Sequence, residues 1–405
     1  MKVVIFTETF LPQVNGVVRT IERIVRYLED KGHEALVITI GDGDDIYSKT
    51  PVARVEGIKF SFYKELYLVK PEDKWFAKIL KQDLMHVPMS ILQALVPNKH
   101  SLVEKVLNQF KPDIIHLATP ATLGAIGLYY VEQMRLPCLA TFHTDLAAYA
   151  PMYQVPYIEE ILNTVTKMVY SKAGRVLAPS PSSQKKLEDI GLTSVGVFGR
   201  GVDAELFNPD KRNKKIWLKY GLDPSAVTLL YVGRLADEKS IPELIEAFLS
   251  LEKGSQKLQL VIVGDGPIKH DLEAKLKHKT KNYIFTGIKK GDELAELYAS
   301  ADIFAFPSRT ETFGQVVLEA MASGLPVVGY DSPGVRDLVR NGETGLLAGI
   351  NELKFKDALE SLINNEATRL RYSTRSRELS LERDWGHILD SLFSEYESLI
   401  GVRIN

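Results

Sequence analysis

Cysteine is almost absent from this chain of 405 residues, which contains only Cys138. A single cysteine excludes an internal disulfide framework and a thiolate metal cluster, and it suits a reducing compartment. The chain has no run of about 18 apolar residues, and its N-terminus lacks the layout of a signal peptide. The net charge of −2 argues against a protein that binds nucleic acid by neutralising its phosphates. We therefore expect a cytoplasmic protein whose contact with the inner face of a membrane is at most peripheral.

Two common nucleotide-binding fingerprints are also missing. In the nearest candidate for G-x-G-x-x-G, which begins at Gly264, Lys269 occupies the third glycine position, so an NAD-dependent dehydrogenase is not indicated. Pro267 is instead predicted to be the first residue of a helix. A Walker A loop does not occur either, which excludes the usual phosphate-binding loop of nucleoside triphosphatases.

What the chain does contain is a regular alternation of short apolar runs with amphipathic segments. This alternation is typical of βα units around parallel sheets, whose buried strands are continuously apolar. The apolar runs are Val3–Phe6, Ala35–Ile40, Ile114–Leu117, Cys138–Phe142, Val176–Ala178, Thr228–Val232, Leu258–Val263, Tyr283–Thr286, Ile303–Phe306 and Pro326–Gly329. A polar segment rich in glycine and proline, at residues 199–221, separates the runs into two α/β halves. Ligands of open parallel sheets bind beyond the carboxyl ends of the strands, so the residues after each run are candidates.

Two candidates lie in the first half of the chain. Gly16 precedes a predicted helix, where backbone N–H groups can approach a phosphate at the positive end of the helix dipole. An ordinary turn between strand and helix is the alternative. His143 follows a buried strand and can exchange a hydrogen bond with a sugar hydroxyl near neutral pH. The alternative for this histidine is a purely structural role.

Positive charge follows the first strand of the second half, at Arg234 and Lys239. A diphosphate leaving group needs such charge when no metal ion is present, and the two side chains supply a planar fork and a compact point charge. The alternative is that both side chains form ion pairs on the solvent-exposed surface. Asp42 and Asp44 could suggest a metal-binding D-x-D motif, but they lie in a polar loop that is typical of a solvated turn. We expect no required metal.

The segment from Glu311 to Glu319 is the strongest feature of the sequence. Its first glutamate lies in a loop, where the carboxylate can accept hydrogen bonds from sugar hydroxyls. Glu319 lies in the following helix, in an apolar run where a charge needs a partner, and it can reach ribose hydroxyls. Gly314 frees the backbone N–H groups at the start of that helix for a sugar or a phosphate.

Taken together, the motifs resemble glycosyltransferase family 4. The shared elements are GRL-x3-K, GDGP, the F-x-G ending at Gly287, E-x7-E, GLPVV, the N-terminal FLPQVNGV and GRGVD. The resemblance implies a retaining, metal-free hexosyltransferase of the α/β GT-B fold, with two Rossmann-like, doubly wound parallel-sheet domains facing across a cleft. Residues 1–200 would form the acceptor domain, joined by a returning C-terminal helix at about 383–405. Residues 201–382 would form the nucleotide-sugar donor domain.

The resemblance also implies roles for individual residues. Arg234 and Lys239 would hold the donor diphosphate, and Glu311 would contact the donor sugar, while His143 would contact the transferred sugar near the reacting carbon. The remaining donor-site residues would be Gly16 near the phosphates, Glu319 on the ribose, Thr312, Phe313 and Gly314 through backbone N–H groups, and Gly287 and Ile288 beside the nucleobase. Ser240 departs from the family, which usually has glycine there.

The finer pattern is similar to the diacylglycerol glucosyl- and sulfoquinovosyltransferases and the lipid α-mannosyltransferases. It implies a lipid acceptor, with UDP-glucose as the first expected donor and GDP-mannose as the second. Lys74, Lys78 and Lys81 lie among aromatic and apolar residues in a segment at 70–96 that could bind a membrane interface or pack as an ordinary helix. A nucleotide-sugar epimerase, a phosphorylase and a non-catalytic nucleotide-sugar-binding protein remain as alternatives.

Overall fold

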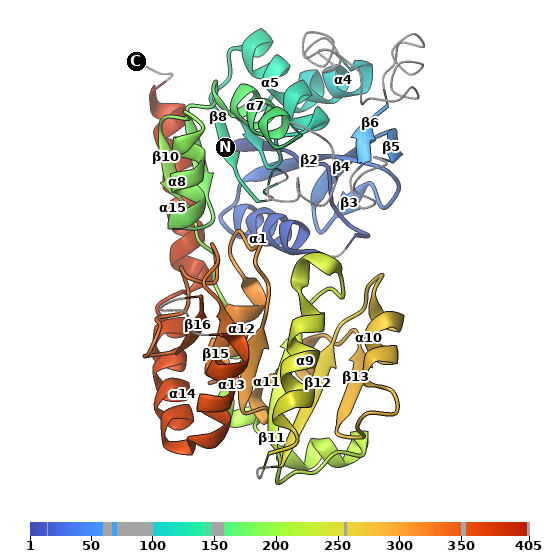
Figure 1. The fold of residues 1–405 in the computed structure, drawn as a ribbon. Coiled ribbons are helices and arrows are strands. Elements are labelled where there is room, and N and C mark those ends of the chain that lie inside the picture. The colour runs from blue at the N-terminus through green and yellow to red at the C-terminus, as the bar shows by residue number, and fades with distance from the viewer. Residues whose placement is uncertain are drawn as a thin grey trace. The chain divides into compact units, whose positions relative to one another are not determined.

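The computed structural model describes residues 1–13, 15–59, 67–70, 100–143, 145, 147, 158–254, 257–349 and 354–402. The chain divides into two compact units (Figure 1). The first comprises Met1–Gly199 and Leu389–Asn405, and the second comprises Arg200–Ile388. Within the described part of the chain, no helix is long and apolar enough to cross a membrane.

The first unit contains an eight-stranded sheet in the order β10-β9-β8-β7-β1-β2-β4-β3, in which only β3 and β4 are antiparallel neighbours. The strands are β1 (Lys2–Phe6), β2 (Glu34–Ile40), β3 (Ile46–Tyr47), β4 (Thr50–Val55), β7 (Ile114–Leu117), β8 (Cys138–Thr141), β9 (Arg175–Ala178) and β10 (Val195–Val197), with a separate hairpin of β5 (Gly57–Lys59) and β6 (Tyr67–Val69). The helices are α1 (Gly16–Asp30), α4 (Ser101–Phe110), α5 (Thr122–Met134), α7 (Ile158–Tyr170) and α8 (Pro181–Asp189).

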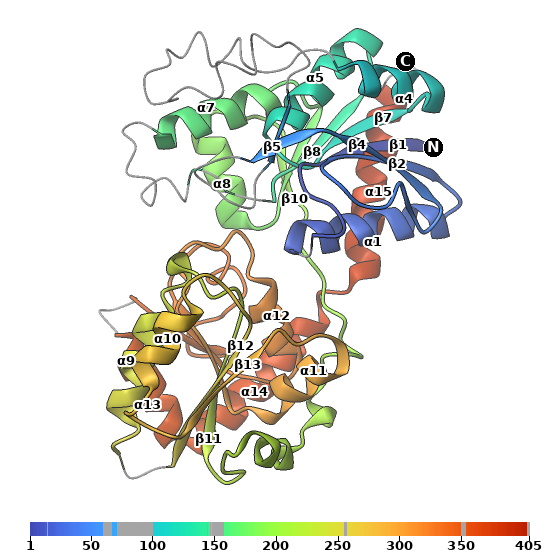
Figure 2. The ribbon, with the colours of Figure 1, turned by 90° about the vertical axis from the view of Figure 1, so that its right-hand side faces the viewer.

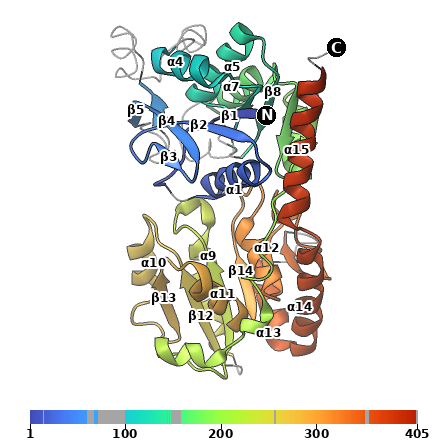
Figure 3. The ribbon, with the colours of Figure 1, turned by 180° about the vertical axis from the view of Figure 1, so that it is seen from behind.

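The C-terminal helix α15 (Trp385–Val402) belongs to the first unit from Leu389 onward. Figures 2 and 3 show it as the red helix that runs along the sheet of this unit. Leu392 and Tyr396 are buried, and the ring of Phe393 stacks on His33 with 5.0 Å between centroids. Apolar and aromatic burial therefore ties α15 to a unit whose sheet ends at Val197, far earlier in the sequence.

The second unit contains six parallel strands in the order β13-β12-β11-β14-β15-β16. They are β11 (Val227–Val232), β12 (Leu258–Val263), β13 (Tyr283–Gly287), β14 (Ile303–Phe306), β15 (Val327–Tyr330) and β16 (Gly345–Ala348). The helices are α9 (Ile241–Leu251), α10 (Lys269–Leu276), α11 (Gly291–Ser300), α12 (Gln315–Ala322), α13 (Phe355–Asn364) and α14 (Glu366–Leu381), with the 3-10 helices η3 (Pro209–Lys211), η4 (Lys214–Tyr220) and η5 (Asp237–Lys239).

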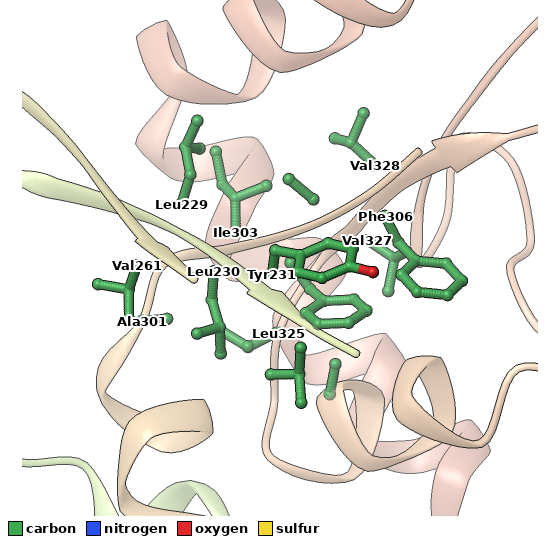
Figure 4. Packing of buried hydrophobic residues seen from close by; sticks show 14 of the residues in the cluster. Leu229, Leu230, Tyr231, Val261, Ala301, Ile303, Phe306, Leu325, Val327 and Val328 are labelled. Atoms are coloured by element: carbon green, nitrogen blue, oxygen red, sulfur yellow. The ribbon is translucent and has the colours of Figure 1, made fainter. Parts of the chain in front are cut away.

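The central strands of the second unit are buried along their whole length. Figure 4 shows apolar side chains from neighbouring strands packing together, among them Leu229, Ile303 and Val327. Helix α9 adds an apolar stripe, because Ile241, Leu244, Ile245 and Phe248 are all buried. Helices cover both faces of the sheet, as shown by α9 in Figure 1 and by α11 in Figure 3.

Each predicted apolar run forms a strand, whose bounds differ by no more than one residue at either end from those predicted. Helix α1 ends at Asp30, and Gly32 adopts a positive φ of 77° immediately after the cap at Lys31. The prediction for Pro267 is wrong, since α10 begins at Lys269. The carbonyl of Gly266 instead accepts a hydrogen bond from the Lys269 amide, so the proline lies in a turn before the helix.

Both main sheets reverse their strand order at one position, between β11 and β14 in the second unit and between β1 and β7 in the first. From such a pair of strands the connections run in opposite directions, so the loops at their carboxyl ends part and leave room for a ligand. The topology therefore marks the loops after these four strands as the places to look for a site.

Candidate active site

The reversal point of the second unit brings together the charged residues that the sequence singles out. Arg234 and Lys239 lie in the loop after β11, and Glu311 lies in the loop after β14, the neighbouring strand. Residues that are more than 70 positions apart in the chain thus meet at one edge of the sheet. This proximity follows from strand order, which the sequence pattern alone does not give.

Lys239 and Glu311 form an ion pair. The lysine Nζ donates to Glu311 Oε1, and Ser308 Oγ donates to the same oxygen at 3.0 Å. The lysine side chain is 15% exposed and the glutamate side chain is 16% exposed. The two groups are shielded enough for a strong charge interaction and still accessible to a ligand.

Arg234 is positioned by residues of β11 and of the loop that follows this strand. The Tyr231 hydroxyl donates to the backbone carbonyl of Arg234 at 3.0 Å, and its ring stacks on Phe306 with 6.1 Å between centroids. The guanidinium pairs with Glu238, four residues later in the chain. Both predicted phosphate-binding cations are therefore paired with carboxylates, and a phosphate would have to share or replace these partners.

Arg200 is a third cation in this cluster, and sequence reasoning does not single it out. Its side chain is buried, with 8% exposed, and the guanidinium lies 5.9 Å from the ring centroid of Phe313. Burial lowers the pKa of Arg200 to about 10, while the negative charge of Glu311 acts in the opposite direction. Among the described residues, Arg200 Nε has no hydrogen-bond partner. The sequence signal that could have pointed to Arg200 is its place in the motif GRGVD. Its burial in the structure is unusual, because arginine side chains are mostly exposed.

The loop that precedes α12 is shaped by two glycines. Gly314 adopts a φ of 87° at the helix N-cap, a conformation that other residues rarely adopt. Gly334 adopts a φ of 74°, and a Cβ atom there would lie 2.8 Å from both Glu311 O and Phe313 N. Phe313 is buried, so only its backbone could contact a ligand. Thr312 lies between these anchored residues.

Glu319 has the partner that its buried position requires. It lies in α12 with 4% of its surface exposed, and the Tyr298 hydroxyl is 3.2 Å from its Oε2. Gly287 ends β13 with a φ of 72° and accepts a hydrogen bond from the Gly264 amide, while Ile288 is 66% exposed. These residues share the carboxyl edge of the sheet with the charged cluster, although the described contacts do not join them to it.

In the first unit, Gly16 is the first residue of α1. The N-cap Asn15 accepts hydrogen bonds from the amides of Val17 and Val18 through Oδ1, each at 3.0 Å. A phosphate at this end of the helix would compete with the asparagine for those amides.

His143 lies two residues after the end of β8 and is buried. Its Nε2 lies 2.9 Å from Thr141 Oγ1, and that oxygen lies 2.8 Å from Nε2 of His116. His116 Nδ1 in turn lies 2.7 Å from the Tyr396 hydroxyl. The candidate histidine therefore belongs to a buried network that reaches the C-terminal helix.

Metal-binding side chains do not gather in the part of the chain that the structure describes, where no group of three or more histidine, cysteine, aspartate or glutamate residues is placed to hold an ion. In the 42–44 loop, Arg54 binds the backbone carbonyls of Asp42 and Asp44 at 2.9 to 3.2 Å. The lysines at 74, 78 and 81, proposed for membrane contact, lie outside the described residues.

Two family models match the chain and together span more than half of it. Residues 92–206 match "Glycosyltransferase Family 4", and residues 214–379 match "Glycosyl transferases group 1". The chain is also 35% identical to the GDP-mannose-dependent alpha-mannosyltransferase of Mycolicibacterium smegmatis, over 100% of this chain and 99% of that protein. It is 30% identical to a sulfoquinovosyl transferase of Arabidopsis thaliana, over 92% and 68%. It is 28% identical to the alpha-monoglucosyldiacylglycerol synthase of Streptococcus pneumoniae, over 86% and 75%.

Solved structures share the fold at lower sequence identity. The sucrose-phosphate synthase of Thermosynechococcus elongatus matches with a TM-score of 0.79 and 20% identity, over 99% of each chain. Anabaena HepE in complex with UDP-glucose matches with a TM-score of 0.73 and 20% identity, over 98% of this chain and 100% of that one. The predicted fold class, with two doubly wound parallel sheets of the GT-B type, is confirmed.

Proposed function

The chain belongs to the family 4 glycosyltransferases, and we propose that it moves a mannosyl group from GDP-mannose to a hydroxyl of a membrane lipid, with retention and without a metal ion. The donor proposal is supported by the mannosyltransferase relatives, which match over the full chain. The lipid proposal is supported by the similarity to monoglucosyldiacylglycerol synthases. UDP-glucose, the first donor expected from the sequence, is the second candidate, because the same synthases are named for a glucosyl product.

The observation that carries this proposal is the charged cluster at the reversal point of the second sheet. Arg200, Arg234 and Lys239 bring three cations to one loop pair, with Glu311 among them. Cations fixed in a partly buried position stabilise the negative charge that develops on a departing diphosphate. The carboxylate of Glu311, held by Lys239 and Ser308, would accept hydrogen bonds from sugar hydroxyls.

The reaction that this arrangement suits breaks the bond between the anomeric carbon and the diphosphate oxygen, and forms a bond from the same carbon to the acceptor oxygen. The proton of the acceptor hydroxyl passes to the departing diphosphate, on the same face of the sugar. No carboxylate nucleophile is needed, and Glu311 is already held by Lys239. His143 would contact the transferred sugar, and Gly16 would contribute its helix start to the phosphates.

A transfer assay tests the proposal. GDP-mannose or UDP-glucose is incubated with diacylglycerol-containing vesicles and the full-length protein in the presence of EDTA, and lipid product is measured. We expect mannolipid, and a loss of roughly 100-fold or more for Lys239→Ala, because one preorganised charge contact in the transition state is removed. Lys257→Ala is the matched control, since Lys257 is 72% exposed and pairs with Asp223 before β12, away from the cluster.

Three outcomes would count against the proposal in different ways. Free mannose without lipid product would indicate hydrolysis, and an isomerised nucleotide sugar would indicate an epimerase. Unchanged donor together with measurable donor binding would indicate a binding protein.

A further inference from the structure

Glu238 is a buried carboxylate at the candidate site to which the proposed reaction assigns no part. It lies in the 3-10 helix η5, between Arg234 and Lys239 in the chain, and its side chain is 7% exposed. Its Oε1 accepts a hydrogen bond from Nη2 of Arg234. The arginine side chain is 32% exposed, so part of it remains accessible to a ligand. A bound anion would therefore share Arg234 with a carboxylate of the protein.

The loop that carries Glu238 is fixed by backbone hydrogen bonds on both sides of this residue. Before it, the Leu235 amide donates to the Asp265 carbonyl at 2.9 Å, and the leucine side chain is fully buried. After it, the Lys239 amide donates to the Ala236 carbonyl at 3.0 Å. A loop held in this way leaves the Glu238 carboxylate little room to withdraw from a bound anion. Its negative charge is therefore a fixed part of the site.

The charges of the cluster favour a weakly held product. Arg200, Arg234 and Lys239 supply three positive charges, while Glu238 and Glu311 supply two negative ones. The diphosphate of a nucleotide sugar carries two negative charges. After it leaves with the acceptor proton, it loses that proton to water at pH 7.5 and carries a third charge, because the second ionisation of a terminal phosphate has a pKa of about 6. Each fixed carboxylate therefore repels the product more strongly than the donor.

We propose that Glu238 competes with the diphosphate for Arg234 and thereby promotes release of the nucleoside diphosphate product. Glu238 is a positioning residue in this role, because it acts on the ligand through the guanidinium and through its own fixed charge. Glu311 also pairs with a cation, but it is proposed to contact the donor sugar, whereas Glu238 has no part of the ligand to hold. The inference rests on the proposed function, because it requires a diphosphate at this edge of the sheet.

Calorimetric titration of the full-length protein in EDTA tests the inference. The ligands are GDP, UDP, their conjugates GDP-mannose and UDP-glucose, and inorganic pyrophosphate. Glu238→Gln keeps the shape of the side chain and an oxygen that accepts from Arg234, but it removes the charge. We expect this variant to bind GDP roughly fivefold to fiftyfold more tightly than the unmodified protein, with a smaller gain for GDP-mannose. The gain should shrink as salt is added, because salt screens charge.

Two further variants separate the charge at this position from side-chain shape and from the total charge of the unit. Glu238→Asp keeps the negative charge on a shorter side chain and should not tighten binding. Glu378→Gln is the matched control, because Glu378 pairs with Arg375 at 2.8 Å, and Arg375 also lies 3.9 Å from Glu343 in the loop before β16, at the opposite edge of the sheet. This control should leave the affinity for GDP unchanged. If Glu238→Gln does not fold, Glu238→Ala replaces it in the same comparison.

The outcomes distinguish this inference from the proposed function. Weaker or unchanged binding of GDP in Glu238→Gln, or equal tightening in Glu238→Asp, would overturn the inference and leave the proposed function standing. Tighter binding of pyrophosphate in Glu238→Gln without binding of any nucleotide would support the competition for Arg234 and contradict the proposed function. Binding of none of these ligands would overturn both. In the transfer assay, the constant for product inhibition by GDP should fall in Glu238→Gln by the same factor as the dissociation constant, and an unchanged constant would contradict the role in release.

Discussion

Ser240 shows how a single residue can retain strain at the edge of the candidate site. It directly follows Lys239 and adopts a left-handed φ of 51° between η5 and α9. The family resemblance implies glycine at this position, and glycine adopts that conformation without a steric penalty. Serine therefore departs from the family in its side chain but keeps the backbone shape that glycine would give.

We expect Ser240→Gly to stabilise the second unit by about 0.5 to 1 kcal/mol, because relief of the left-handed strain exceeds the extra chain entropy of glycine in the unfolded state. The measurement is equilibrium urea unfolding. Ser398→Gly, in the exposed interior of α15, should instead cost about 0.5 to 1 kcal/mol. A loss of stability in Ser240→Gly would contradict this account of the turn.

A second prediction at the residue scale concerns Gly334. Gly334→Ala introduces a Cβ atom 2.8 Å from the backbone of Glu311 and Phe313, at a φ of 74°. We expect it to displace that loop, to destabilise the protein by about 1 to 3 kcal/mol and to weaken nucleotide-sugar binding. Gly342→Ala is the control, because its φ of 82° is similar but no atom lies within 4 Å of the added Cβ. Equal binding losses in both variants, measured by calorimetry, would contradict the role assigned to the Gly334 contact.

At the scale of elements, Glu8 links the end of β1 to the start of α5. Its carboxyl is 2% exposed, and Oε1 accepts hydrogen bonds from the amides of Leu123 at 2.8 Å and Gly124 at 3.4 Å. Among the described residues, Oε2 has no partner. Burial outweighs the two amides and raises the pKa of Glu8 from 4.5 to about 7.

The raised pKa of Glu8 predicts the sign of a pH effect on stability. The folded state holds this proton more tightly than the unfolded state, so the contribution to stability is full below pH 4.5 and is lost as pH rises through about 7. Glu8→Gln removes the charge, and we expect it to gain stability relative to the original protein as pH rises from 5 to 8, by at most about 3 kcal/mol. Urea unfolding at several pH values measures the difference. A constant difference across that range would contradict the assignment.

The elements that the sequence predicts correctly are those with a clear local signal. β1 from Val3 onward and β12 are buried on both faces, so their residues read as apolar runs, that of β12 interrupted by the buried Gln259. β10 is a three-residue edge strand, and β4 mixes buried residues with exposed and partly exposed ones, so the search for continuous runs missed both. The hydrogen bonds that join His143 to His116 through Thr141, and the Arg200 contact, could not be predicted, because they depend on which strands and helices become neighbours in the fold.

At the scale of the whole molecule, the chain contains two main sheets, and the order of the strands reverses at one position in each. In the second unit the reversal point holds the charged cluster, and in the first it holds Glu8 at the start of α5. The sequence motifs placed Arg234, Lys239 and Glu311 at strand ends, and strand order brings the loops that carry them together. The sequence does not predict the ion pair between Lys239 and Glu311, because the resemblance implies separate roles for them: Lys239 would hold the diphosphate of the donor, and Glu311 would contact its sugar.

The central claim is that the second unit binds a nucleotide sugar through this cluster without a metal ion. Calorimetric titration of the full-length protein with GDP-mannose and with UDP-glucose, in the presence of EDTA, tests it most directly, together with Lys239→Ala and Lys257→Ala. We predict binding of GDP-mannose in EDTA, weakened by roughly 10-fold to 100-fold in Lys239→Ala and unchanged in Lys257→Ala. Absence of binding to either nucleotide sugar, or binding that appears only after Mg²⁺ is added, would contradict the account.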